Sequence, residues 1–386
     1  MKLSERLARL GTETAFEVLV RARALEAKGR SVIHLEIGEP DFDTPAHVVE
    51  AGIAALKAGA THYGPAAGLP ELRQAVAEDS TARRAVKATP EMVVVTPGGK
   101  PIMFYLILAL VDPGDEVLYP NPGFPIYESM IRYIGGVPVP VRLLEEKSHG
   151  LDVDQLIAKI TPKTRLIVLN YPHNPTGGII PEAGLRAIAD AAAQHGIPVL
   201  SDEIYSQILY EGRHVSIAAM PGMEPLAIVL DGFSKTYAMT GWRLGYGIMP
   251  APLAQVVAKL QTNAVSCTAT FTQKAGIAAL RGDHAPVHAM VAEFKRRRDA
   301  IVDGLRAIPG FKCARPQGAF YVFPNITGTG FPAKPLADRL LDEAGVACLS
   351  GTAFGEWGEG HLRFSYANSL DNIQEALRRI RACLAK

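Results

Sequence analysis

The segment LAIVLDGFSKTYAMTGWRLG, residues 226–245, places a short apolar run directly before a loop rich in glycine, hydroxyl and basic side chains. The apolar run, residues 226–231, is typical of a strand buried on both faces of a parallel sheet. Ligands of open parallel sheets bind beyond the carboxyl ends of the strands, which is where Lys235 would lie. The segment therefore predicts a ligand site at one edge of a sheet.

Four further apolar runs of the same kind occur earlier in the chain, and helical segments separate several of them. These runs are residues 92–96, 116–119, 165–170 and 197–202. Strands that alternate with helices are typical of a mostly parallel sheet covered by helices on both faces. Because glycine, asparagine, aspartate or tyrosine follows each run, we expect these polar residues to meet at the same edge of the sheet.

The pattern of predicted elements changes near residue 286. There, a charged helix is followed by a few short strands and a last helix. We therefore predict an α/β protein with a large, ligand-binding domain over residues 46–285. A smaller α+β domain is expected over residues 286–386, and residues 1–45 are expected to contribute to it.

The segment TPAHVVEAGIAALKAG, residues 44–59, predicts a helix that begins after Thr44 as its N-cap. Val49, Ile53 and Leu56 recur at the spacing of one helix face. This spacing is typical of an amphipathic helix.

Net charge, apolar runs and cysteine spacing limit the partners, the metals and the location that are expected for this chain. Its 40 Lys and Arg against 39 Asp and Glu give a net charge of +1, so neither a nucleic-acid nor a membrane partner is expected. The longest apolar run, residues 102–111, is about half of the ~20 residues that span a bilayer. The four cysteines show no spacing typical of a metal site, and the first 29 residues lack the apolar core of a signal peptide. A cytoplasmic location without a metal is expected.

The loop around Lys235 has the side chains that a phosphate requires. Ser234 precedes this lysine and Arg243 follows it, which supplies hydroxyl and guanidinium donors. Gly99 and Lys100 open another predicted helix, whose backbone N–H groups could bind the same anion. A lysine kept partly desolvated near other cations loses basicity and can act as an amine nucleophile. These parts fit a phosphorylated cofactor linked to a lysine better than a nucleotide, since the P-loop pattern is absent.

Other residues that follow the predicted strands have either a structural or a cofactor-binding interpretation. Asp202 could cap a helix or form a salt bridge, or it could hold the protonated ring nitrogen of pyridoxal phosphate. Tyr205, three residues later, could reach the ring oxygen of such a cofactor. Asn174 lies in an Asn-Pro turn, and Phe124 is either a core aromatic or a surface on which a flat cofactor stacks. The patterns GxSxG and HExxH are absent, and so is GxGxxG after a strand, which disfavours hydrolase, zinc-protease and nicotinamide chemistry.

The chain resembles the class I, or fold-type I, pyridoxal-phosphate aminotransferases. The stretch GFSKTYAMTGWRLG is similar to the lysine signature of that family. EIGEPDFDTP, THYGPAAGLPELR, NYPHNPTGG, SDEIY and HLRFSYAN resemble its other landmarks and come in the family's order, between about residues 36 and 367. The likeness is greatest to the bacterial aspartate aminotransferases.

This resemblance implies a role for each matching residue. Lys235 would be linked to pyridoxal 5′-phosphate and would later move the substrate proton. Asp202 would pair with the ring nitrogen, and Tyr205 and Asn174 with the ring oxygen. The residues that would hold the phosphate are Gly99, Lys100, Ser234, Arg243 and Tyr63 of the partner subunit.

The resemblance also implies a site for the substrate. Arg363 would bind the substrate α-carboxylate, with Asn174 and the backbone of Gly38. Phe124 stands at the ring-stacking position, where many aspartate-specific members have tryptophan, which weakens the case for aspartate. No arginine can be assigned from the sequence to a distal carboxylate.

The implied function is transfer of an amino group from an L-amino acid to a 2-oxoacid by a ping-pong mechanism in a homodimer. Aspartate with 2-oxoglutarate is the first expectation; alanine, aromatic and basic amino acids stay open as donors. A carbon–sulfur lyase or a cyclopropane-forming synthase of the same fold is an alternative, and so is a non-catalytic sensor. The sensor would need an appended DNA-binding domain, of which the sequence gives no sign.

Overall fold

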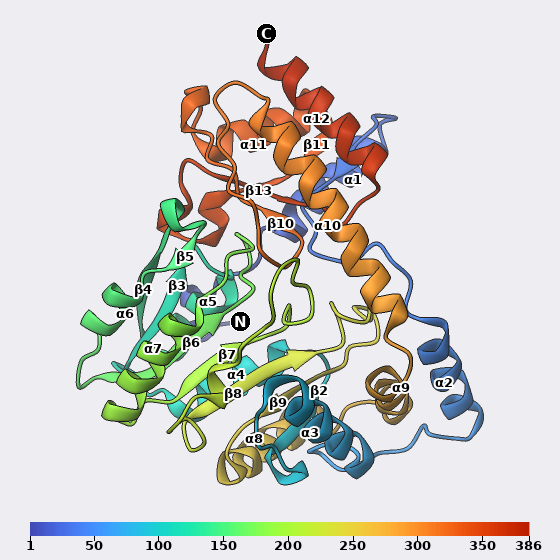
Figure 1. Ribbon diagram of the computed structural model, residues 1–386, viewed down its shortest axis with the longest axis vertical. Coiled ribbons are helices and arrows are strands. Elements are labelled where there is room, and N and C mark those ends of the chain that lie inside the picture. Colours follow the sequence, from blue (N-terminus) through green and yellow to red (C-terminus); the bar gives the residue numbers. More distant parts are fainter. Residues whose placement is uncertain (386) are drawn as a thin grey trace.

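An eight-stranded sheet is the largest sheet within residues 1–385, the part of the chain that the computed structural model describes (Figure 1). Its strand order is β2-β9-β8-β7-β6-β3-β4-β5. The strands are β2 (Val93–Thr96), β3 (Glu116–Asn121), β4 (Val137–Leu144), β5 (Gly150–Leu151), β6 (Thr164–Asn170), β7 (Val199–Asp202), β8 (Ala227–Gly232) and β9 (Gly245–Ile248). All five apolar runs of the sequence form strands of this sheet, which confirms the predicted α/β fold class.

The sheet is mostly parallel, as expected, with antiparallel pairs near its two edges. Strands β4, β3, β6, β7 and β8 run in parallel, whereas β9 is antiparallel to both β2 and β8, and β5 is antiparallel to β4. Glycine-rich β9 has no apolar run that would predict it. A Cβ on Gly245 would lie 2.5 Å from the backbone nitrogen of Gly99, so this glycine lets the first turn of a helix approach the strand.

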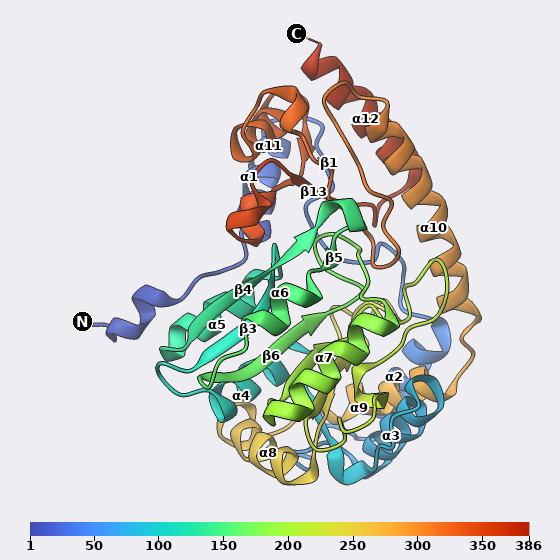
Figure 2. The ribbon, with the colours of Figure 1, turned by 60° about the vertical axis from the view of Figure 1, so that its left-hand side comes forward.

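Helices cover both faces of the sheet (Figures 1 and 2). Leu166 and Val168 of β6 belong to a core with side chains of α4, α5 and α8, whereas the alternate residues Ile167 and Leu169 pack with α6 and α7. Burial on both faces explains why β6 reads as a continuous apolar run. The helices of this part are α2 (Ala46–Lys57), α3 (Pro70–Arg84), α4 (Lys100–Leu110), α5 (Pro125–Ile134), α6 (Val153–Ala158), α7 (Glu182–His195), α8 (Ala251–Val265) and α9 (Thr270–Arg281).

A smaller α+β domain lies beyond the carboxyl ends of the central strands, and α10 runs along both parts (Figures 1 and 2). Its three-stranded sheet has the order β10-β13-β12, and β1 pairs with β11 in parallel. These strands are β1 (Ile33–His34), β10 (Tyr321–Val322), β11 (Val346–Ala347), β12 (Leu349–Ser350) and β13 (Leu362–Ser365). The helices are α1 (Ala15–Glu26), α10 (Ala285–Arg306), α11 (Ala333–Asp342) and α12 (Leu370–Leu384).

The N-terminal segment contacts this smaller domain at several points. Ala22 of α1 is fully buried against Leu341 and Ala347, and the guanidinium of Arg21 pairs with Asp338 at 2.5 Å. The boundaries at residues 45 and 285 stay a prediction. No helix within the described residues is both long and apolar enough to cross a lipid bilayer.

The start of α2 differs from the prediction. Its N-cap residue is Pro45, and Thr44 does not cap the helix. The hydroxyl of Thr44 instead donates a hydrogen bond to the carbonyl of Ala238 at 2.7 Å and accepts one from Nε1 of Trp242 at 3.0 Å. Thr44 thus fixes the start of α2 to the loop that follows β8.

The buried face of α2 is not the face that carries Ile53 and Leu56. Ile53 and Leu56 are 38% and 47% exposed. A Cβ on Gly52 would lie 2.7 Å from the Trp242 ring, so close packing demands small side chains on this face. The buried residues are Val48, Gly52 and Ala55. The larger apolar side chains consequently point away from the core.

Candidate functional site

A cavity of about 460 Å³ lies at the carboxyl ends of the central strands, where the two parts of the chain meet. Asn170 ends β6 and Asp202 ends β7, and both line the cavity. The cavity brings together eleven of the twelve residues that the sequence predicts for a site. They are Gly38, Gly99, Lys100, Phe124, Asn174, Asp202, Tyr205, Ser234, Lys235, Arg243 and Arg363.

Lys235 lies in the loop that follows β8, with its amine buried at the cavity. The Nζ atom donates a hydrogen bond to the carbonyl oxygen of Gly38 at 2.5 Å. Burial, with the cationic side chains of Lys100 and Arg243 nearby, lowers the pKa of Lys235 to about 8. A substantial share of this amine is therefore unprotonated near pH 8, as a nucleophile or a base requires.

Asp202 presents a buried carboxylate to the same cavity. Its Oδ2 accepts a hydrogen bond from the hydroxyl of Tyr127 at 2.6 Å, and its Oδ1 accepts one from the backbone N–H of Ile204 at 3.2 Å. Burial raises the pKa of Asp202 to about 6, and the nearby carboxylates of Asp231 and Glu203 add to the rise. Since no basic side chain pairs with it within residues 1–385, Asp202 is suited to a cationic group of a ligand.

Tyr205 and Tyr321 form the wall beside Asp202. Their hydroxyl oxygens are 2.7 Å apart, and both side chains are buried. A Cβ on Gly38 would lie 2.0 Å from the Tyr321 hydroxyl, so only glycine fits at position 38. The close approach places the Gly38 carbonyl within reach of Lys235.

The first turn of α4 and the neighbouring loop form a cradle for an anion. Helix α4 begins after Gly99, without a side-chain cap on its N–H groups. Gly98 adopts φ +91°, and a Cβ there would lie 2.3 Å from the Arg243 guanidinium, so this glycine admits that side chain to the helix start. The Ser234 hydroxyl lines the same cavity. Helix N–H groups with a guanidinium and a hydroxyl are the donors that a phosphate binds.

Arg363 of β13 is the cation on the opposite, small-domain side of the cavity. It is only 4% exposed, and burial lowers its pKa, although guanidinium stays charged in proteins. One terminal nitrogen is 3.4 Å from Oδ1 of Asn174, and another donates to the carbonyl of Glu36. The Nε atom has no hydrogen-bond partner among the described residues. A buried donor of this kind is suited to a carboxylate of a bound ligand.

Tyr63, the twelfth predicted residue, lies outside the cavity and is 89% exposed. The family resemblance assigns Tyr63 to the site of a partner subunit, and this assignment stays a prediction. Several lining residues were not predicted from the sequence. They include Glu13, Phe16, Glu39, Tyr127, Asn170 and Tyr321. Glu39, in EIGEPDFDTP, and Asn170, the last residue of an apolar run, were within predicted motifs; Glu13 had no comparable signal.

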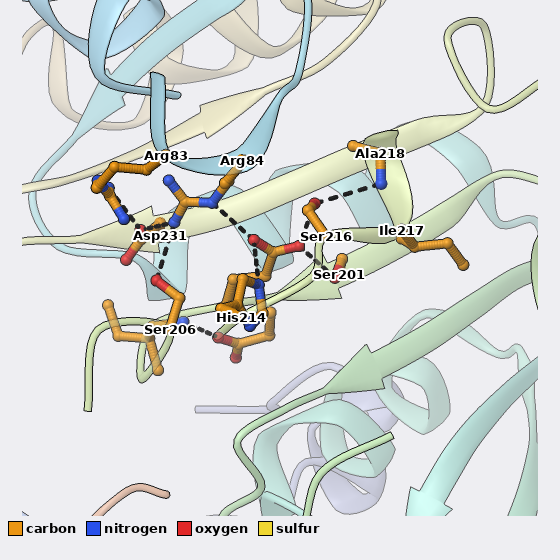
Figure 3. Close-up of polar contacts among 12 residues, drawn as sticks. Arg83, Arg84, Ser201, Ser206, His214, Ser216, Ile217, Ala218 and Asp231 are labelled. Atoms are coloured by element: carbon orange, nitrogen blue, oxygen red, sulfur yellow. Dashed lines mark hydrogen bonds and ion pairs between the residues drawn. The ribbon is translucent and has the colours of Figure 1, made fainter. Parts of the chain in front are cut away.

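A buried ionic network fixes the strand ends behind the site (Figure 3). Arg84 of α3 donates to Oε2 of Glu203 at 2.7 Å and to the hydroxyl of Ser206 at 3.1 Å, and it also pairs with Asp231. Although burial opposes it, the basic side chains of His214 and Arg84 hold the pKa of Glu203 well below its usual range. Glu203 follows Asp202 directly, and Asp231 lies on β8, so Arg84 joins the two strands that carry the site.

Comparison with known proteins identifies the family. The family model for aminotransferases of class I and II matches residues 30–380. The chain belongs to this family. Over 390 residues, the aminotransferase is 40% identical to the probable aspartate/prephenate aminotransferase of Aquifex aeolicus, covering 99% of this chain and 98% of the relative.

Two further comparisons extend along nearly the whole aminotransferase. The aspartate aminotransferase of Thermus thermophilus with maleate superposes with a TM-score of 0.95 at 39% identity, covering 99% of this chain and 100% of the other. The arginine–pyruvate transaminase of Pseudomonas aeruginosa is 38% identical, covering 96% of this chain and 95% of the relative. These likenesses confirm the expected family and its fold.

Aminotransferases of this family use pyridoxal 5′-phosphate. When bound, this cofactor accepts the electron pair that the substrate α-carbon releases with its proton. The cavity fits the group. Asp202 is a buried carboxylate that pairs with no cation within residues 1–385, and Lys235 is an amine of lowered pKa. The first N–H groups of α4, beside Arg243, have no side-chain cap.

Proposed function

We propose that this aminotransferase moves the amino group of an L-amino acid to a 2-oxoacid such as 2-oxoglutarate by a ping-pong mechanism. Aspartate is the proposed first donor. The observation that supports this most directly is that Lys235, Asp202 and Arg363 face one cavity with the charges that the reaction needs.

In this proposal Arg363 and Asn174 bind the substrate α-carboxylate, which orients the α-carbon toward Lys235. The Nζ atom of Lys235 would act as the base that takes the proton from that carbon and later returns it. Asp202 stabilises a proton on the ring nitrogen, and Tyr205 and Asn174 hold the ring oxygen. Phe124 packs against the ring.

The phosphate is proposed to bind the backbone of Gly99 and Lys100, with Ser234 and Arg243. This assignment leaves the ammonium of Lys100 as the remaining cation among the described lining residues. A distal carboxylate, such as that of aspartate, would meet Lys100. The name of the Aquifex relative supports aspartate, whereas the name of the Pseudomonas relative, at almost the same identity, shows that arginine is the donor of a similar chain.

Titration of the purified holoenzyme with single amino acids tests this function. The absorption band of the lysine-linked cofactor should convert to that of the aminated cofactor with aspartate, and 2-oxoglutarate should restore it. Donors that convert the band then rank the specificity. A band that no amino acid converts would overturn the aminotransferase assignment of this chain's site and favour the lyase alternative.

We propose that the active form is a homodimer in which Tyr63 of the partner subunit completes the phosphate site. Its support is the exposure of Tyr63 and of apolar side chains on α2 and α4, namely Ile53, Leu56 and Leu108. Burial of such side chains stabilises symmetric dimers. Sedimentation should give twice the chain mass of 41.4 kDa, and activity should fall on dilution to monomer. A fully active monomer would contradict the proposal. The cytoplasmic location stays a prediction.

A further inference from the structure

The charges of the cavity wall do not balance once the cofactor and the substrate α-carboxylate are accommodated. The cationic lining residues are Lys100, Lys235, Arg243 and Arg363, and the acidic ones are Glu13, Glu39 and Asp202. In the proposed function Asp202 faces the ring nitrogen, Lys235 the reacting carbon, Arg243 the phosphate and Arg363 the α-carboxylate. One cation, Lys100, and two carboxylates, Glu13 and Glu39, then remain for the substrate side chain.

Glu13 is placed in this wall by the segment that precedes α1. Gly11 donates its N–H to the hydroxyl of Ser129 at 2.9 Å and accepts a hydrogen bond from the same hydroxyl at 3.0 Å. Ser129 belongs to α5, so these two hydrogen bonds join the segment to the large domain at this point. Two residues further on, the Glu13 carboxylate pairs with the ammonium of Lys100 at the start of α4.

The two side chains of this ion pair differ in their exposure to solvent. The Lys100 side chain is 50% exposed, whereas that of Glu13 is 19% exposed. Only Oε1 of Glu13 contacts the ammonium, and Oε2 has no hydrogen-bond partner among the described residues. Lys100 can therefore turn toward water at little cost, because solvent-exposed ion pairs contribute little to stability. Glu13 stays at the cavity, where its Oε2 atom can accept a hydrogen bond from a ligand.

The negative charge of Glu13 reaches the reacting groups across the cavity. Burial lowers the pKa of Lys235, and the carboxylates of Glu39 and Glu13 oppose that change. Burial likewise lowers the pKa of Arg363, and Glu13 again opposes it. A charge that acts on both Lys235 and Arg363 also acts on a substrate held between them.

We propose that Glu13 is a specificity-determining residue that favours amino donors whose side chain ends in a cation and disfavours acidic donors. An ammonium or guanidinium can bind Oε2, or can replace Lys100 at Oε1. A side-chain carboxylate can reach Lys100 only by separating it from Glu13, and it then lies near the uncompensated carboxylate. The inference rests on the proposed amino transfer at this cavity, and it revises the proposed donor from aspartate to an amino acid with a cationic side chain.

The test compares wild-type holoenzyme with Glu13→Gln, which keeps the shape of the side chain and removes its charge. We expect kcat/KM for L-arginine and L-lysine to fall about tenfold and that for L-aspartate to rise about tenfold, each mainly through KM. Binding supplies a readout without turnover: the α-methyl derivatives of arginine and aspartate have no α-proton, and their dissociation constants should shift in the same directions.

Glu17→Gln is the matched control, because Glu17 lies on the exposed side of the first turn of α1 and does not line the cavity. It removes one negative charge from the same segment and should leave the arginine-to-aspartate ratio unchanged. An equal effect of Glu13→Gln on both donors, or a wild-type enzyme that binds neither cationic analogue, would overturn the inference. A wild-type enzyme that binds the analogues but converts no donor would refute the proposed function instead.

Discussion

Replacement of Lys235 with alanine should reduce transamination by at least about 10³-fold, the largest effect on activity that we expect from a single substitution. The side chain supplies both the amine that attaches the cofactor and the base that moves the α-proton. Asp202, Arg243 and the start of α4 stay in place in the variant. We therefore expect it to bind the cofactor without the covalent link, which shifts the absorption band.

Lys235→Arg is the control for charge, since it keeps a cation in the cavity but offers no nucleophilic amine. It should be as inactive as the alanine variant. Single-turnover measurements with the best donor would give the loss directly. If Lys235→Ala kept more than a few per cent of the wild-type rate, the base would have to be another residue.

The pKa of about 8 for Lys235 adds a pH dependence to this prediction. Below that pH the amine is mostly protonated and cannot attack the cofactor aldehyde; above it the amine is mostly free. The rate at which cofactor-free protein captures the cofactor should therefore rise as pH increases through about 8 and then level off.

Replacement of Arg84 with methionine should lower the free energy of unfolding by about 3–5 kcal/mol, the largest loss of stability that we expect from one substitution. Arg84 is buried between Glu203 and Asp231 (Figure 3). Methionine fills much of the space but leaves two carboxylates inside the protein with one cation fewer. The cost arises from these uncompensated charges rather than from lost packing.

Urea unfolding of the wild type and variant measures this cost. Arg281→Met serves as the control, because Arg281 pairs with Glu78 at 2.9 Å on the surface, where both side chains are about half exposed. The control should change the free energy of unfolding far less than Arg84→Met does, because exposed ion pairs contribute little to stability. The double variant Arg84→Met/Glu203→Gln should recover part of the loss. A cost for Arg84→Met as small as that of the control would show that the network contributes little.

Much of the site could be predicted because its residues follow strands that the sequence makes easy to recognise. Asp202 ends one apolar run, and Lys235 follows another closely. In a parallel sheet the carboxyl ends of the strands share one edge, so residues far apart in the chain meet there without any knowledge of side-chain contacts. The family motifs then added Arg363 and Gly38, which no strand-end argument would have placed.

The sequence by itself determined the α/β class and the central strands, because these depend on local patterns of apolar and polar residues. It also indicated eleven residues of the cavity, nine of them from the loops and turns near strand ends, and Arg363 and Gly38 from family motifs. Only the tertiary structure showed that α2 buries Gly52 rather than Ile53, since close packing against Trp242 selects small side chains. Only the tertiary structure brought Glu13 to Lys100, 87 residues away. Long-range contacts of this kind depend on how the N-terminal segment lies against α5, and no periodicity in the chain encodes that path.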